Sequence, residues 1–281
     1  MRADPATAPR VFVIVQRAGI ATLGALVGAG FRRFATYRQA TLAAAVTNSV
    51  FGFLRCSVLL ATLAGSGAAA VAGYDTGQLV LYCWASQGLI GVIGMWGWTE
   101  LGDRIRSGDV VGDLLRPVHP QLAYLAVDLG RAAHAGLTRF VVPVAVGALL
   151  FPMHVPRLLT LLWFVLSTGL AVLVSFGGRY LMNATAYWSL DARGVNTLWL
   201  FATTVLAGLM FPLHFLPEGL RLALWVLTPF PSMLQAPLDV LAERGPVPLV
   251  VAGQAAWAAI LLGLGRVVQA RAERRLVIQG G

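Results

Sequence analysis

The sequence QLVLYCWASQGLIGVIGMWGWT, residues 78–99, contains no charged side chain, and ELGDRIRSGDVVGDLLRPVHPQ, residues 100–121, follows it directly. The second stretch holds four of the chain's twelve carboxylates and three of its arginines. A hydrocarbon core about 30 Å thick is crossed by about 20 mostly apolar residues in a helix. The first stretch therefore predicts a membrane-spanning helix, and the second predicts a loop at the membrane surface.

The whole chain has the composition of a membrane protein. Of its 281 residues, 58% are hydrophobic and only 12% are charged, whereas a soluble domain carries about 25% charged residues. We therefore expect one integral membrane domain over residues 1–281. All the basic residues are arginine, and a nucleotide-binding P-loop requires a lysine. An ordinary ATPase is thereby excluded.

Helical spans account for most of the remaining chain, so the predicted fold class is an all-α integral membrane protein with six transmembrane helices. The third predicted span is the weakest, because His134 and Arg139 lie in its first half and Pro143 should kink it. The six spans occupy residues 42–267 and are predicted at 42–65, 78–99, 133–152, 158–179, 195–216 and 247–267.

Residues 10–41 precede the first span and predict an N-terminal interfacial helix. The apolar run AGIATLGALVGAG, residues 18–30, is too short to cross a bilayer and is flanked by arginines. A cleaved signal peptide would place Arg32, Arg33 and Arg38 on the translocated side, against the usual bias of basic residues. We therefore expect a helix that lies in the interface.

The distribution of arginine predicts the orientation. With both termini cytoplasmic, seventeen arginines fall inside or at the inner boundary and three outside, with Arg55 left within a span. This asymmetry is typical of the positive-inside rule. It explains the net charge of +9 without nucleic-acid binding, and it makes residues 268–281 a cytoplasmic tail of a multi-pass protein in the cytoplasmic (inner) membrane.

Residues 107–117, SGDVVGDLLRP, predict a short cytoplasmic helix between the second and third spans. Ser107 or Asp109 can cap its N-terminus, and Pro117 ends it. Its apolar side chains fall on one face, and its charged side chains surround that face. The apolar set is Val110, Val111, Leu114 and Leu115, and the charged set is Asp109, Asp113 and Arg116.

The apolar face of this helix can rest on the membrane or on neighbouring helix ends, or it can bind another protein. Interfacial helices usually carry basic side chains on their polar face, and anionic lipid headgroups would repel the carboxylates of Asp103, Asp109 and Asp113. A mixed-charge helix with an apolar ridge fits a groove in a protein partner. The charge pattern favours the partner.

Residues 211–246 predict an external helical hairpin before the last span. Two apolar segments, 219–227 and 233–241, are too short to cross, and prolines around them prevent their fusion into one helix. Two interpretations stay open, namely an outer lid over a pathway and a packed external cap. The hairpin residues singled out are Pro212, Pro217, Glu218, Pro229, Pro231 and Pro237.

Three polar residues lie inside predicted spans, namely Asn48, Arg55 and Gln87. An arginine at the bilayer centre costs about 2.5–3.5 kcal/mol on insertion scales. Arg55 therefore either lines a central path or a subunit interface, or extends its side chain to the membrane surface. Asn48 and Gln87 carry the same ambiguity at lower cost.

Catalytic and metal-binding motifs are not found in the sequence. The four histidines have no ligand spacing, and G-x-S-x-G and H-E-x-x-H motifs do not occur. Cys56 and Cys83 lie inside apolar runs and are interpreted as buried thiols. We expect no metal, no cofactor and no catalytic residue in this chain.

The order of these segments resembles that of an ABC-2-type permease, the membrane subunit of an ABC transporter. The stretches that carry the resemblance are IRSGDVVGDLLRPV (105–118), ATAYWSLDARGVNTL (184–198), FPLHFLPEGL (211–220) and ARAERRLVIQGG (270–281). The resemblance implies that residues 109–116 form a coupling helix to an ATPase, that the N-terminal segment is the connecting helix, and that residues 217–243 are external re-entrant helices.

The resemblance also implies the partners and the activity. ATP and Mg would be bound by separate ABC ATPase subunits, and a second permease chain, identical or a paired homologue, would face this one within the lipid. The expected activity is export of an apolar or amphiphilic small molecule, such as a drug or natural product, by alternating access. The alternative is an integral-membrane enzyme or scaffold without an ATPase partner.

Overall fold

The computed structural model describes residues 19–66, 70, 72–189 and 191–279, with side chains up to residue 274. This part of the chain is helical and contains no strand. Its elements are α1 (Ile20–Ala35), α2 (Arg38–Ser66), α3 (Thr76–Ile93), α4 (Glu100–Ser107), α5 (Val110–Leu114), α6 (Pro120–Ala135), the π-helix η2 (Gly136–Phe140), α7 (Val141–Leu150), α8 (Leu158–Ala184), α9 (Ala186–Ser189), α10 (Arg193–Leu206), the 3-10 helix η3 (Leu213–Phe215), α11 (Glu218–Leu227), α12 (Gln235–Leu241) and α13 (Val247–Gln279).

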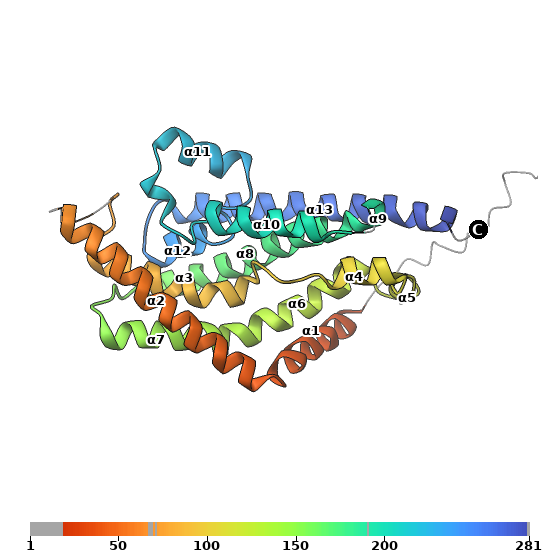
Figure 1. Ribbon diagram of the computed structural model, residues 1–281, viewed down its shortest axis with the longest axis horizontal. Helices are drawn as coiled ribbons and strands as arrows, with labels where there is room; N and C mark the ends of the chain where they lie inside the picture. The colour runs from red at the N-terminus through yellow and green to blue at the C-terminus, as the bar shows by residue number, and fades with distance from the viewer. Residues whose placement is uncertain (1–18, 67–69, 71, 190, 280–281) are drawn as a thin grey trace, which may run out of the picture.

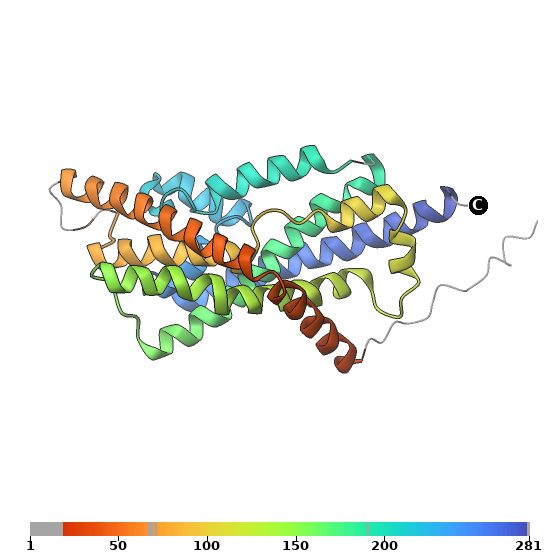
Figure 2. The same ribbon diagram turned by 60° about the horizontal axis from the view of Figure 1, so that its bottom comes forward.

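The long helices run along one axis and form an elongated bundle (Figure 1). α4, α5 and α9 gather at one end, which we call the α5 end, and α11 and α12 gather at the other, which we call the α11 end. The last turns of α13 also lie at the α5 end. α1 diverges from the bundle beside α6, as the rotated view shows (Figure 2).

α3 is the central helix, and most of its residues are buried against α2, η2, α7 and α8. It begins with a capping box, in which the Asp75 carboxylate accepts from Gln78 N (2.8 Å) and the Gln78 side chain accepts from Asp75 N (3.1 Å). It ends where Gly94 takes the left-handed conformation with φ 64°. The prediction of a helix over 78–99 is therefore wrong beyond Ile93.

Glycines allow the neighbouring helices to approach α3 closely. Gly52 of α2 and Gly147 of α7 both face the ring of Trp84, and Gly88 of α3 faces Phe140. A Cβ atom at any of these glycines would meet the facing ring at less than 3.0 Å. The two flanking helices are thus fixed against the central one by ring-to-backbone contacts.

The third predicted span is longer than expected, because α6, η2 and α7 run together from Pro120 to Leu150. Pro143 has no N–H to donate to the carbonyl of Arg139 four residues earlier. The π-helix at 136–140 includes that carbonyl. The kink expected at Pro143 is therefore observed as a change from α-helix to π-helix about one turn earlier in the chain.

The fifth predicted span, 195–216, is too long. α10 ends at Leu206, and the chain then turns at Gly208, whose φ is 89°. This left-handed conformation favours glycine, and Pro212 cannot continue a helix. At 1.5 Å per residue, the 14 residues of α10 extend about 21 Å.

Four helical segments of the described chain have the length and composition of membrane spans. They are Arg38–Gly65, Pro120–Leu150, Leu158–Ser189 and Val247–Arg274. The protein is therefore a multi-pass membrane protein. α3 and α10 are shorter, with 18 and 14 residues. Residues 268–279, expected as a tail, continue α13 as helix.

α1 packs across α6 through two glycines. A Cβ atom at Gly30 would overlap the carbonyl oxygen of Val127, and one at Gly130 would overlap that of Val27. The predicted interfacial segment 10–41 is thus a helix from Ile20, with 38–41 belonging to α2, while residues 10–18 lie outside the described residues.

The α1–α6 crossing leads to a stability prediction. Gly130→Leu should lower the melting temperature of the detergent-solubilised protein by about 3–10 °C, because the new side chain forces the two backbones apart. Gly24→Leu is the control, since no atom lies within 4 Å of a Cβ at Gly24. Equal melting of Gly130→Leu and wild type would contradict the close crossing.

Candidate functional site

The charged stretch after α3 folds as two short helices, α4 and α5, joined at Gly108 with φ 83°. The sequence analysis predicted only one helix here and missed α4. The sequence contained a signal for α4, because Leu101 and Ile105 are apolar residues four positions apart. Both side chains are buried in the structure. Acidic side chains occupy the first turn of α4 and basic ones its last turn, which complements the helix dipole.

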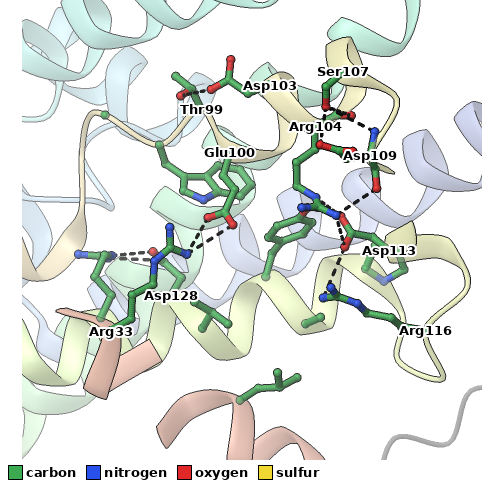
Figure 3. Close-up of a pocket in the computed structure, with 18 of the residues that line it drawn as sticks. Arg33, Thr99, Glu100, Asp103, Arg104, Ser107, Asp109, Asp113, Arg116 and Asp128 are labelled. Atoms are coloured by element: carbon green, nitrogen blue, oxygen red, sulfur yellow. Dashed lines mark hydrogen bonds and ion pairs between the residues drawn. The ribbon is translucent and has the colours of Figure 1, made fainter. Parts of the chain in front are cut away.

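Asp113 is buried and fixes α5 to its neighbours, rather than lying at an exposed rim as predicted. Its carboxylate accepts from Arg104 Nε (2.6 Å) and Nη2 (3.0 Å), and from the Tyr124 hydroxyl of α6 (2.6 Å). Arg116 Nη1 lies 3.5 Å away. These contacts converge on Asp113 in Figure 3. The hydrogen bond to Asp113 raises the pKa of Arg104.

The predicted apolar ridge is divided between the interior and the surface. Val110 is only 1% exposed and packs in a cluster with Leu101 and Ile105, so its predicted contact with a partner is wrong. Val111 is 51% exposed and Leu115 is 74% exposed, while Leu114 is half-buried. The division follows from the geometry of α5, because positions 110 and 113 share the face that points into the bundle and positions 111 and 115 share the opposite face.

α1 is tied to this unit by an ion pair, in which Arg33 Nη1 lies 3.1 Å from Glu100 Oε2 (Figure 3). Between α1, α4, α5 and α6 lies a cavity of 760 Å³, with Trp98 and Tyr124 among its aromatic walls. Its rim carries both acidic and basic side chains. One of the acidic side chains, Asp109, accepts a hydrogen bond from the Ser107 hydroxyl (2.8 Å). Ion pairs thus join α1 to α4 and α4 to α5, and the hydrogen bond from Tyr124 to Asp113 joins this unit to α6.

A second ion-pair cluster lies just inside the bundle. Asp128 of α6 accepts from Arg131 Nε (2.7 Å) and from Arg179 Nη2 of α8 (2.8 Å). Arg131 also donates to the carbonyls of Gly91 (2.6 Å) and Val92 (3.1 Å) at the end of α3. Both arginines are among the seventeen that the sequence analysis placed inside or at the inner boundary, and Asp128 was not identified there. The spacing of Asp128 and Arg131, i and i+3, was the available signal.

The polar residues of the first two spans are brought together by the structure. Asn48 Nδ2 donates to the carbonyl of Gln87 (3.0 Å), and Arg55 Nη1 donates to Ser86 Oγ (3.2 Å). Arg55 therefore turns toward α3 rather than toward the membrane surface. Its Nη2 is buried and has no hydrogen-bond partner among the described residues.

Two short helices, α11 and α12, lie in the segments predicted at 219–227 and 233–241. They differ in environment, because every residue of α12 is buried and none of α11 is. Pro217 caps α11. Pro237 is the third residue of α12, where a missing N–H costs no intrahelical bond. Glu218 lies in the first turn of α11, and the connecting loops hold Pro212, Pro229 and Pro231.

A buried polar network attaches α12 to the start of α3. The Tyr74 hydroxyl donates to Asp239 Oδ1 (2.8 Å), and Gln235 Nε2 donates to the same oxygen (2.7 Å). Tyr82 donates to Gln235 Oε1 (2.9 Å). His214 Nδ1 lies 3.1 Å from the Tyr74 oxygen and 3.7 Å from Asp239 Oδ1. The sequence analysis did not find this network.

Burial shifts the pKa values of the two titratable groups in opposite directions. It raises the pKa of Asp239 to about 7, against the lowering effect of the hydrogen bonds from Tyr74 and Gln235. It lowers the pKa of His214 to about 4, assisted by the charges of Arg244 and Arg221. At neutral pH the imidazole is uncharged, so its contact with Asp239 is not an ion pair.

A comparison with known protein families matches residues 51–280 to the model described as "ABC-2 family transporter protein". The chain belongs to the ABC-2 transporter family. An ABC-2 protein is a membrane component of a transport system rather than an enzyme. No curated protein and no solved structure matches the chain. Among the described residues, no group of three His, Cys, Asp or Glu side chains is arranged to hold a metal ion.

The Asp113 contacts predict a selective loss of stability in this ABC-2 protein. Asp113→Asn should lower the free energy of unfolding by about 1–3 kcal/mol, because Arg104 and Tyr124 lose a charged acceptor. Asp109→Asn is the matched control, since Asp109 is exposed. Thermal or denaturant unfolding in detergent measures both variants. A larger loss for Asp109→Asn would contradict the assigned roles.

The Asp239 and His214 pKa values predict opposing pH effects. In His214→Gln, melting temperature should fall as pH rises from about 4 to 7, because the unfolded state releases the Asp239 proton near 3.8 and the folded state retains it to about 7.

In Asp239→Asn, melting temperature should fall as pH drops from 6.5 toward 4, because folded His214 resists protonation. Parallel melting curves for the two variants would refute these assignments.

Proposed function

We propose that this ABC-2 protein is the membrane-spanning permease subunit of an ATP-driven exporter for an apolar or amphiphilic small molecule. The family match over residues 51–280 supports the transport role. The exposed pair Val111 and Leu115, on a helix that the buried Asp113 holds to the bundle, supports a rigid contact with a soluble partner. The proposed partner is an ABC ATPase that binds ATP and Mg.

In this proposal the chain crosses the membrane six times, through α2, α3, α6–α7, α8, α10 and α13. Successive crossings alternate in direction, which is consistent with α1 and the end of α13 lying near the same end of the bundle (Figure 1). α3 and α10 are short because each ends at a glycine-marked turn. The positive-inside distribution of arginine supports a cytoplasmic α5 end in the inner membrane.

The ion pairs suggest how movement at the partner would reach the spans. Force on α5 passes to α4 through Asp113 and Arg104 and to α6 through Tyr124. α6 is joined to α3 and α8 through Asp128 and its two arginines. In alternating access, ATP would close the ATPase dimer, and two permease chains, identical or paired homologues, would reopen outward.

At the opposite end, α11 and α12 are proposed to form the external re-entrant hairpin. α12 is packed against α8 and bonded to the start of α3 through Tyr74 and Asp239. α11 has no buried residue, and its Leu222 and Leu227 are exposed. This arrangement supports an outer lid whose inner half is anchored.

A co-purification experiment tests the proposed contact. The tagged permease, co-expressed with each ABC ATPase of the same genome in turn, should retain one of them on the affinity column. Leu115→Asp should reduce the recovered ATPase at least about tenfold, because a carboxylate desolvated in an apolar groove is strongly unfavourable.

Leu227→Asp is the matched control, because Leu227 is equally exposed, at 74%, but lies at the α11 end. Both variants must insert in the membrane and elute as wild type in size exclusion. Retention of the ATPase by Leu115→Asp, or its loss from Leu227→Asp as well, would overturn the proposed contact.

A further inference from the structure

Arg55 lies too deep in the first long span to reach the membrane surface. It is 17 residues from Arg38 and 11 from Ser66 in α2, distances of about 25 and 16 Å along the helix. An arginine side chain extends only about 7 Å toward the surface. The guanidinium also turns inward and donates to Ser86 Oγ on α3 (3.2 Å).

Three other arginines that are withdrawn from solvent have carboxylate partners. Arg104 pairs with Asp113, and both Arg131 and Arg179 pair with Asp128. Within the described part of the chain, Arg55 makes no ion pair and hydrogen-bonds only to Ser86, and its buried Nη2 has no acceptor. A charged guanidinium inside a membrane requires a counter-charge or water.

A second cation without an ion pair lies along the same central helix. Arg139, in η2, packs its aliphatic chain across Gly91 of α3, and its buried Nε has no partner among the described residues. Gly91 is five residues from Ser86, or about 7.5 Å along α3. Two uncompensated positive charges therefore border α3 within the candidate spans Arg38–Gly65 and Pro120–Leu150.

The candidate spans of the described chain offer no unpaired carboxylate at this depth. The four candidate spans contain only two acidic residues, Asp128 and Glu273. Asp128 is already bound by two arginines, and Glu273 accepts from Gln269 near the end of α13. A second copy of the chain has the same residues, so pairing in a homodimer would not neutralise Arg55.

The surface of α2 beside Arg55 is apolar and open. Phe51, Leu54 and Val58 are all exposed. Phe51 and Val58 lie four and three residues from Arg55 and are therefore its neighbours on the helix, and Leu54 lies between them at the same spacings. The site thus presents a guanidinium next to an apolar strip. This combination matches a molecule with an anionic group and a hydrocarbon body.

We propose that Arg55 binds the carboxylate or phosphate group of an anionic amphiphile that this transporter moves, with its apolar part along α2. The guanidinium donates charge-assisted hydrogen bonds to the anion, and Arg139 adds positive potential along α3. The inference names the substrate class of the proposed exporter and rests on that proposed function.

Photolabelling of the purified full-length permease tests the inference without any ATPase. The protein is placed in phosphatidylcholine nanodiscs at pH 9 and exposed to either of two 16-carbon probes with a terminal diazirine, one a carboxylic acid and the other the chain-matched alcohol. Mass spectrometry then quantifies labelling of the peptides from α2 and α3. Labelling by the carboxylate should exceed labelling by the alcohol about tenfold, equivalent to about 1.4 kcal/mol.

Variants identify the group responsible. Arg55→Gln should reduce labelling by the carboxylate probe to the level of the alcohol probe, whereas Arg55→Lys should retain most of the carboxylate labelling. Arg157→Gln is the control, because it alters an exposed arginine at the N-terminus of α8, and it should leave carboxylate labelling unchanged. Equal labelling of the wild type by acid and alcohol would overturn the inference even if Arg55→Gln fails to fold. Full carboxylate labelling of folded Arg55→Gln would also overturn it.

A further arm distinguishes the source of the anion. Added phosphatidylglycerol that competes with the carboxylate probe would identify a membrane lipid as the anionic amphiphile, and the absence of competition would favour a smaller carboxylate; both results support an anionic site. The assay is independent of ATPase association. Loss of the ATPase contact alone would therefore count against the proposed function, and equal labelling by the two probes would count against this inference.

Discussion

The arrangement of the bundle depends on the ion pairs of Asp128. Through Arg131 it holds the carbonyl end of α3, and through Arg179 it holds α8, so one carboxylate joins three helices. Arg179 is only 3% exposed. Removal of one partner from such a buried cluster costs about 3–5 kcal/mol, since a desolvated charge is left without compensation. The cost makes this junction rigid.

A rigid junction explains why the charged stretch after α3 can serve as a contact surface. α4 and α5 are too short to be stable alone. Asp113 fixes them to α6 through Tyr124, and Glu100 fixes α1 to α4 through Arg33. The same residues that make the stretch conspicuously charged are thus largely used inside the molecule. Val111 and Leu115 are the apolar side chains of α5 left most exposed for a partner.

The fold class could be predicted from the sequence because the bilayer imposes a length rule on apolar helices. The positions of α2, α8 and α13, and the two short helices α11 and α12, were found in this way. Helix ends were predicted less well. α3 and α10 stop early at Gly94 and Gly208, whose left-handed conformations a hydropathy pattern does not reveal.

A helix at the position of α5 was expected from the sequence, but its packing was not. Helical periodicity placed Val110 beside Val111, yet it does not specify which side of a short helix faces the bundle. That choice depends on Arg104 and Tyr124, which meet Asp113 from two other helices. The Asp239 and Asp128 networks were missed for the same reason, because their partners are distant in sequence. Arg55 was identified from its cost in a membrane, and the structure adds that it lacks a carboxylate.

Site-specific crosslinking in cells tests the central claim that α5 contacts an ATPase. Val111 is replaced by p-benzoylphenylalanine, with Leu227 at the α11 end as the comparison position, and the cells are irradiated. The account predicts a covalent adduct between the permease and the ABC ATPase from position 111 and none from position 227. No adduct from position 111, or equal adducts from both positions, would contradict it.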